Sequence, residues 1–209
     1  MKASVFPNWT VLLKEVGPKE RPAALRLANR LRFSMEVDSK GGIHVNHQII
    51  GPKPNKATLN ALDNMAKGVD LSITSFLMSW TPFMLTYLIP ENLDQFVLQD
   101  LDSQRVLTFK QGEVEVTVAI AKDFEIKELR TPQGAIKPLL TKNKDGFVLT
   151  GYEGDNEDPV VGKVIKAKIV SVPTQGMLLP STVLLNGSAG ATPINFEMRI
   201  TNYVLKRRA

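Results

Sequence analysis

Hydrophobic and polar residues alternate along much of this chain, and a period of two is the pattern of β-strands. The first alternation begins at residue 25, pauses at a Gly-Gly turn after residue 40, and continues to residue 49. Its polar positions include Arg26, Arg30 and Arg32, and most positions of its other parity are apolar. We therefore predict a strand hairpin over residues 25–49.

Two segments have the 3.6-residue period of a helix instead. Asn8 precedes four apolar residues that share one helical face, which predicts a short helix over residues 8–16. A longer apolar stripe with steps of three and four predicts a helix over residues 58–89. Pro82 lies inside this segment and lacks a backbone N–H, so we expect the helix to kink or split there.

The remainder of the chain, residues 95–205, consists of short alternating runs separated by glycine-containing turns. This spacing is typical of consecutive antiparallel strands. We predict one domain over residues 1–209 of the α+β class, built on a large antiparallel sheet of roughly eight to eleven strands. A sheet of that size curls rather than staying flat.

Composition adds limits to this picture. The 209 residues are 43% hydrophobic and 22% charged, as in an ordinary soluble globular protein. The net charge of +5 is divided into +6 over residues 1–56, −5 over 57–131 and +4 over 132–209. The basic ends favour an anionic surface such as lipid head groups, and a merely solvated surface is the alternative. The absence of cysteine excludes disulfides, thiolate metal sites and a cysteine nucleophile.

The segment from Leu71 to Pro90 carries no charge over twenty residues, the length of a membrane span. Its hydroxyl residues, its central proline, its one-sided stripe and its acidic flanks argue against a span. Two interpretations remain: a helix packed wholly in the core, or a helix that also lines an apolar cavity. Flexible methionine and broad aromatic side chains suit an apolar ligand. The candidate lining residues are Phe76, Leu77, Trp80, Phe83, Met84, Tyr87 and Leu88.

No pattern in the sequence indicates catalysis. His44 and His47 are the only histidines, and their odd separation places them on opposite faces of a strand, which argues against a shared metal. No nucleophile elbow, paired carboxylates or glycine-rich phosphate loop is found. Basic residues do not interleave with aromatic ones, as they do in many nucleic-acid binders. We therefore expect no enzyme, no metal, no cofactor and no nucleic-acid partner.

The order of a helix, a strand hairpin, an apolar helix and a run of strands resembles the LolA-like fold of periplasmic lipoprotein carriers. In the second half of the chain the resemblance is carried by DFEIKEL (123–129), VIKAKIV (164–170), MLLPSTVLLNG (177–187) and NFEMRITNYVLKR (195–207). The resemblance implies an unclosed β half-barrel whose concave face is covered by helices, with an apolar cavity for acyl chains between them.

The same resemblance implies a function and a location. It implies a non-enzymatic protein of the bacterial cell envelope that binds a lipid acyl chain or a lipidated protein. In such carriers a basic residue of an early strand holds the covering helix closed, and Arg26, Arg30 and Arg32 are the candidates here. A periplasmic protein would have lost a signal peptide, and a cytoplasmic location is the alternative. The alternative function is a structural or interaction module with a fully packed core and no ligand.

Overall fold

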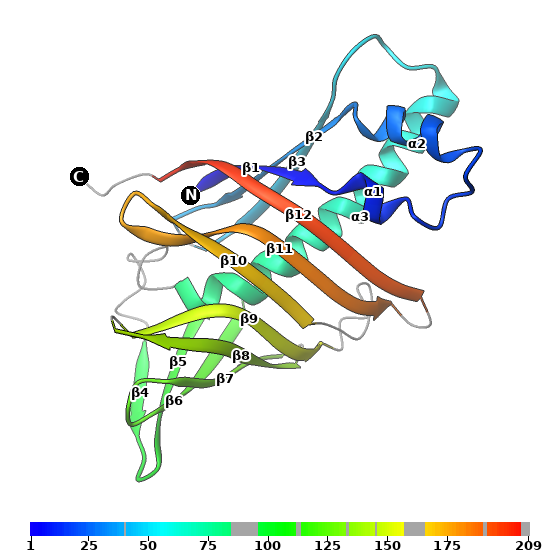
Figure 1. Ribbon diagram of the computed structural model, residues 1–209. Helices are drawn as coiled ribbons and strands as arrows, with labels where there is room; N and C mark the ends of the chain where they lie inside the picture. The colour runs from blue at the N-terminus through cyan, green and yellow to red at the C-terminus, as the bar shows by residue number, and fades with distance from the viewer. Residues whose placement is uncertain are drawn as a thin grey trace.

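The computed structural model describes residues 1–39, 41–84, 96–111, 114–132, 134–144, 146–156, 166–189 and 192–205. One sheet of twelve strands dominates this part of the chain, in the order β3-β2-β1-β12-β11-β10-β9-β8-β7-β6-β5-β4 (Figure 1). All neighbouring strands run antiparallel. The sheet does not close, because β3 and β4 are its two edges. The predicted large, unclosed antiparallel sheet of an α+β protein is confirmed.

The strands follow one another along the chain with few interruptions. Their bounds are β1 Lys2–Pro7, β2 Leu31–Val37, β3 Ile43–Ile49, β4 Val97–Asp100, β5 Gln104–Gln111, β6 Val114–Ala121, β7 Ile126–Thr131, β8 Gly134–Asn143, β9 Gly146–Asn156, β10 Lys166–Thr174, β11 Met177–Ala189 and β12 Thr192–Val204. The helices are α1 Trp9–Leu12, α2 Arg21–Ala28, α3 Lys56–Trp80 and the 3-10 helix η1 Thr81–Met84.

The N-terminal strand β1 was not among the predicted elements. It pairs with β12 on one side and β2 on the other, so the first residues of the chain lie in the interior of the sheet. Only Ala3 and Val5 turn inward from it, and two apolar residues are too few to establish a period. The described strands therefore number twelve, more than the eight to eleven that turn spacing predicted.

The strand predicted from residue 25 was wrong in its first part, where residues 21–28 form helix α2. Pro22 lies in the first turn of this helix, where its fixed φ and missing N–H are compatible with helical structure. Alanine, leucine and arginine, which fill the next positions, are strong helix formers. The true strand begins at Leu31 and pairs with β3 as far as Ile49. Leu25 and Leu27 fitted the strand parity by coincidence.

The two other predicted helices exist with different bounds. Asn8 caps α1 by accepting a hydrogen bond from the backbone N–H of Val11 at 3.4 Å, but the helix ends at Leu12 instead of residue 16. Asn55 caps α3 in the same way, 2.8 Å from the N–H of Thr58. The α-helix ends at Trp80 and changes to 3-10 geometry where Pro82 removes a donor. The predicted continuation to residue 89 lies outside the described residues.

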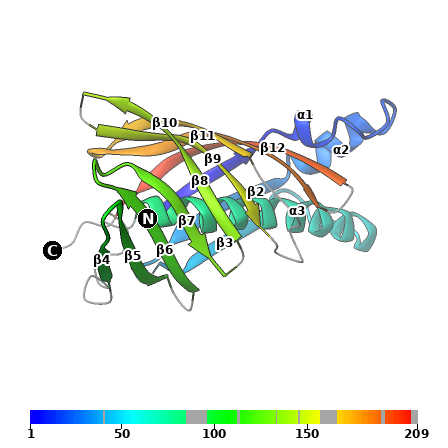
Figure 2. The same ribbon diagram turned by 90° about the horizontal axis from the view of Figure 1, so that it is seen from below.

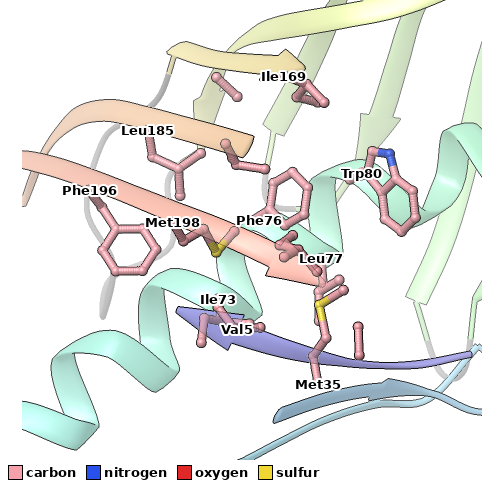
Figure 3. Close-up of a cluster of buried hydrophobic side chains, with 14 of the residues drawn as sticks. Val5, Met35, Ile73, Phe76, Leu77, Trp80, Ile169, Leu185, Phe196 and Met198 are labelled. Carbon is pink, nitrogen blue, oxygen red and sulfur yellow. The ribbon is translucent and has the colours of Figure 1, made fainter. Parts of the chain in front are cut away.

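One buried cluster joins α3 to the sheet. Figures 1 and 2 show the sheet bending around this helix, while α1 and α2 lie together near the N-terminal end of α3. In Figure 3 the side chains of Phe76 and Leu77 point into a cluster with Met35 and Met198. The α3 side chains in this cluster, each less than one-tenth exposed, are Leu62, Ala66, Val69, Ile73, Phe76, Leu77 and Trp80.

A His–Asp pair fastens α3 to the edge strand β3. Nδ1 of His47 lies 2.7 Å from Oδ2 of Asp70, with side chains 31% and 25% exposed. The other carboxylate oxygen of Asp70, Oδ1, is buried and has no hydrogen-bond partner among the described residues. The pair therefore holds a carboxylate that is poorly solvated.

Replacing His47 by alanine should lower the free energy of unfolding by about 1–3 kcal/mol, because Asp70 then loses the partner of its second oxygen. The matched control is His44→Ala, since His44 lies 3.1 Å from Asp38 in a more exposed pair. Exposed ion pairs contribute about 0–1 kcal/mol. Urea unfolding of both variants at neutral pH tests this. Equal losses in the two variants would contradict the role given to Asp70.

Candidate functional site

The sheet opens where β9 meets β10. Within the described residues, these strands pair at three positions, which are Glu153 with Lys166, Tyr152 with Ala167, and Gly151 with Lys168. Beyond Gly151, residues 146–149 remain paired with β8, and residues 169–174 remain paired with β11. Figure 1 shows the β8–β9 and β10–β11 hairpins fanning apart from this short seam. We call the three residue pairs the β9–β10 seam.

Local sequence explains why pairing stops there. The backbones approach so closely at Gly151 that a Cβ atom on it would lie 2.2 Å from the carbonyl oxygen of Ala167. Register shifts occur in both flanking ladders, between Leu139 and Leu140 and between Val170 and Ser171. Such bulges bend the strand that carries them and increase its twist. The two hairpins therefore turn away from each other beyond the seam.

A pocket of about 650 Å³ lies between the diverging hairpins and the end of α3. Its volume is within the range of about 300–1,000 Å³ that is usual for small-molecule sites. Among the described residues that line it, none is charged, and the polar side-chain groups are the hydroxyl of Ser171 and the indole N–H of Trp80. The lining residues are Trp80, Phe83, Phe124, Ile126, Leu140, Gly146, Phe147, Val148, Leu149, Ser171, Gly176, Met177 and Leu178.

The residues predicted to line a cavity divide into three groups. Trp80 and Phe83 line the pocket. Phe76 and Leu77 are fully buried in the core instead, because their positions on α3 face the sheet (Figure 3). The ring of Trp80 stacks on that of Phe76 at 5.8 Å between centroids, so it connects core and pocket. The side chain of Met84, and all of Tyr87 and Leu88, lie outside the part of the chain that the structure describes.

Most of the pocket wall comes from strands that the sequence did not assign to a site. Phe147 and Leu149 were recognised as alternating strand residues, and Gly176 as part of a turn. Their proximity to Trp80 depends on strand pairing between distant parts of the chain. No local pattern in the sequence encodes that proximity.

The three arginines proposed to hold a covering helix lie apart. Arg26 is exposed on α2, and Arg30 follows that helix, so neither lies on a strand as predicted. Arg32 on β2 donates to the backbone carbonyl oxygens of residues 29 and 31, both at 2.9 Å. Arg30 donates to the carbonyl oxygen of Ile50 at 3.0 Å and also to that of Pro52, which precede α3. Arg30 thus ties down the connection that leads into α3.

Two tyrosines, Tyr152 and Tyr203, lie beside the pocket strands, the first fully buried and the second half-buried. Tyr152 of β9 is hydrogen bonded to the side chain of Ser79 on α3, and burial raises the pKa of its hydroxyl well above the ordinary value. Tyr203 of β12 donates to the carbonyl oxygen of Pro180 at 2.6 Å, and burial raises its pKa as well. Both hydroxyls therefore stay neutral in the folded protein at pH values where an exposed tyrosine ionises.

The raised pKa values of these two tyrosines predict that the protein loses stability at alkaline pH. Below about pH 10 the tyrosines are protonated in both states and add no pH dependence. Above that pH the unfolded chain loses protons that the folded chain keeps, so the free energy of unfolding falls by about 1.4 kcal/mol per pH unit for each buried tyrosine. Urea unfolding of the wild type and of Tyr152→Phe from about pH 9 to about pH 11 measures it. The variant should show a shallower decline, and parallel curves would contradict the prediction.

The described residues contain few other features that could form a functional site. His44 and His47 contact different aspartates, and no group of three or more histidine, aspartate or glutamate side chains in the described ranges could hold a metal ion. None of the described helices is long and apolar enough to cross a membrane. The pocket at the diverging hairpins is therefore the feature from which we argue function.

No family model matches the chain, and neither a curated protein sequence nor a solved structure matches it.

Proposed function

We propose that the chain is a non-enzymatic binding protein that accommodates an acyl chain, or the acyl chain of a lipidated protein, in the pocket beside Trp80. The observation that carries this proposal is that the described residues lining a pocket of about 650 Å³ between α3 and the sheet are all uncharged. Each buried CH₂ group contributes about 0.8 kcal/mol, so a chain of several carbons gains enough free energy to bind without specific polar contacts.

The architecture supports the same proposal. We interpret the unclosed sheet as a β half-barrel and α3 as the helix that covers its concave face, an arrangement like that of the LolA-like lipoprotein carriers. The contact of α3 with β2 and β3 and its share in the buried cluster favour this interpretation. A cell-envelope location, with lipid or a lipidated protein as partner and no cofactor, follows from the interpretation and is part of the proposal.

A structural or interaction module without a ligand is the second candidate. It is favoured by the full burial of Phe76 and Leu77, which pack against protein and leave no room beside them for a lipid. Under this alternative the pocket holds only solvent.

Leu178→Glu separates the two candidates. Leu178 lines the pocket and is 42% exposed, so a glutamate there should fold normally while placing a charge at an apolar surface. Fluorescence of Trp80 in a Trp9→Phe background reports ligand entry, because Trp80 lines the pocket and these are the only two tryptophans. We expect decanol to change this fluorescence and Leu178→Glu to weaken its binding at least about tenfold.

The matched control is Leu59→Glu, which introduces the same charge at a residue 38% exposed on the first turns of α3. Its affinity for decanol should equal that of the parent protein. Native mass spectrometry of detergent-free protein adds an independent readout of co-purifying lipid. No fluorescence response together with no bound lipid would exclude the carrier function and favour the module.

A further inference from the structure

An arginine faces inward on the sheet beside the pocket. Along β5, Phe109, Leu107 and Arg105 share one parity; Phe109 is buried and Leu107 packs on the core. Arg105 pairs with Ile120 on β6, which pairs with the pocket residue Ile126 on β7. Residues paired across strands lie on the same face, so Arg105 lies about 10 Å from Ile126 on the pocket side.

The guanidinium of Arg105 is incompletely satisfied. Its Nη1 atom is buried and has no hydrogen-bond partner among the described residues. Its Nε lies 3.7 Å from Asp100, whose carboxylate also accepts a hydrogen bond from Lys122. A buried hydrogen-bond donor without a partner lowers the stability of the fold, and a charged donor lowers it more. The inward position of Arg105 therefore calls for an acceptor that the described residues do not supply.

Phe124 connects this arginine to the pocket. The Cζ atom of Arg105 lies 4.8 Å from the centroid of the Phe124 ring, and the same ring lines the pocket. Phe124 is 71% exposed and has a φ of 69°, a conformation that bulky side chains rarely adopt. Backbone strain of this kind is concentrated at binding sites. Nζ of Lys142 lies 5.5 Å from the ring of Phe147, another lining residue of the pocket.

We propose that the ligand of this pocket is an amphiphile with an anionic head group, a carboxylate or a phosphate, and that Arg105 is the residue that recognises it. The inference rests on the proposed binding function and names its ligand class. The chain of the amphiphile occupies the pocket, and its head group lies beside Phe124, where it pairs with the guanidinium of Arg105. Asp123, which accepts the backbone N–H of Glu125 at 3.2 Å, is the carboxylate next to Phe124 and opposes this binding.

Matched amphiphiles test the proposal. Decanoate and decanol have the same carbon count and differ in head-group charge, and each is titrated into the Trp9→Phe protein at about pH 8, where a carboxylate is ionised. We expect decanoate to bind at least about tenfold more tightly, as a charge-assisted hydrogen bond at a partly buried site provides. Arg105→Gln should reduce this ratio to about threefold or less, because it removes the charge that distinguishes the two ligands.

Arg199→Gln is the control variant, because Arg199 also lies over a phenylalanine, 5.8 Å from the Phe6 ring, but away from the pocket. It should keep the full preference for decanoate. Decyl phosphate, included as a third ligand, should depend on Arg105 in the same way as decanoate.

The outcomes separate the two proposals. Binding of decanol and decanoate with equal affinity overturns the head-group assignment and leaves the carrier function standing. Binding of neither overturns both. A preference that survives in Arg105→Gln excludes Arg105 as the residue that recognises the head group. Displacement of decanoate by inorganic phosphate alone would show a free-anion site, which also contradicts the proposal.

Discussion

Trp80→Ala is expected to lower the free energy of unfolding by about 3–5 kcal/mol. Trp80 is 2% exposed, stacks on Phe76 and ends the α-helical part of α3. Removing the indole deletes that stacking and leaves a cavity, and the surrounding strands can close it only in part. Because Trp80 also forms the pocket wall, the new cavity is continuous with the pocket. Most small domains are stable by about 5–15 kcal/mol, so the loss is severe.

The control for this substitution is Trp9→Ala. Trp9 is half-buried and packs on Phe33 at 6.1 Å between centroids, far along the sheet from the pocket. Trp9→Ala should lower the free energy of unfolding clearly less than Trp80→Ala does, as measured by urea unfolding. Equal losses would mean that Trp80 is no more important to the core than a peripheral aromatic residue.

Much of the strand content could be predicted from the sequence because most of the strands carry their own alternation of apolar and polar residues. The alternating run at Phe196, Met198 and Ile200 is an example, and these residues are buried on β12. Where a short run of apolar residues fits both the strand period and the helix period, the local pattern does not determine which element forms, as at Leu25 and Leu27. The formation of β1 depends on tertiary pairing, because β1 lies between β2 and the C-terminal strand β12 and has only two inward apolar residues of its own.

Gly151→Ala should lower the free energy of unfolding by about 2–3 kcal/mol, near the upper end of the usual overpacking cost. The added Cβ atom would lie 2.2 Å from the backbone oxygen of Ala167, and a backbone atom cannot rotate away as a side chain can. The β9–β10 seam must then separate at its last pair. Since the seam has only three residue pairs, the hairpins would diverge further and the hydrogen bond between Tyr152 and Ser79 would be disturbed.

Gly68→Ala provides the matched comparison. Gly68 lies in the interior of α3, and a Cβ atom there meets nothing within 4 Å. Alanine in a helix is favoured over glycine by about 0.5–1 kcal/mol, so this variant should gain stability. Chemical unfolding of the two variants should therefore give shifts of opposite sign. A loss below about 0.5 kcal/mol for Gly151→Ala would contradict the close approach at the seam.

The candidate site was predictable only where it lies on one element. The predicted lining contains Trp80 and Phe83, which line the pocket, but it also contains Phe76 and Leu77, which do not. Periodicity assigns residues to a face of a helix and does not tell which part of that face meets a strand and which part meets a gap. The gap arises from the β9–β10 seam and its flanking bulges, which are properties of paired strands.

Methyl NMR of the seven methionines tests the binding account most directly. Met177 lines the pocket, whereas Met35 and Met198 are fully buried in the core and serve as internal references. On titration of ¹³C-methyl-methionine protein with decanol, the Met177 signal should shift in a saturable manner while those of Met35 and Met198 stay in place. An unchanged Met177 signal at saturating decanol, or equal shifts of all three, would contradict an acyl-chain site beside Trp80.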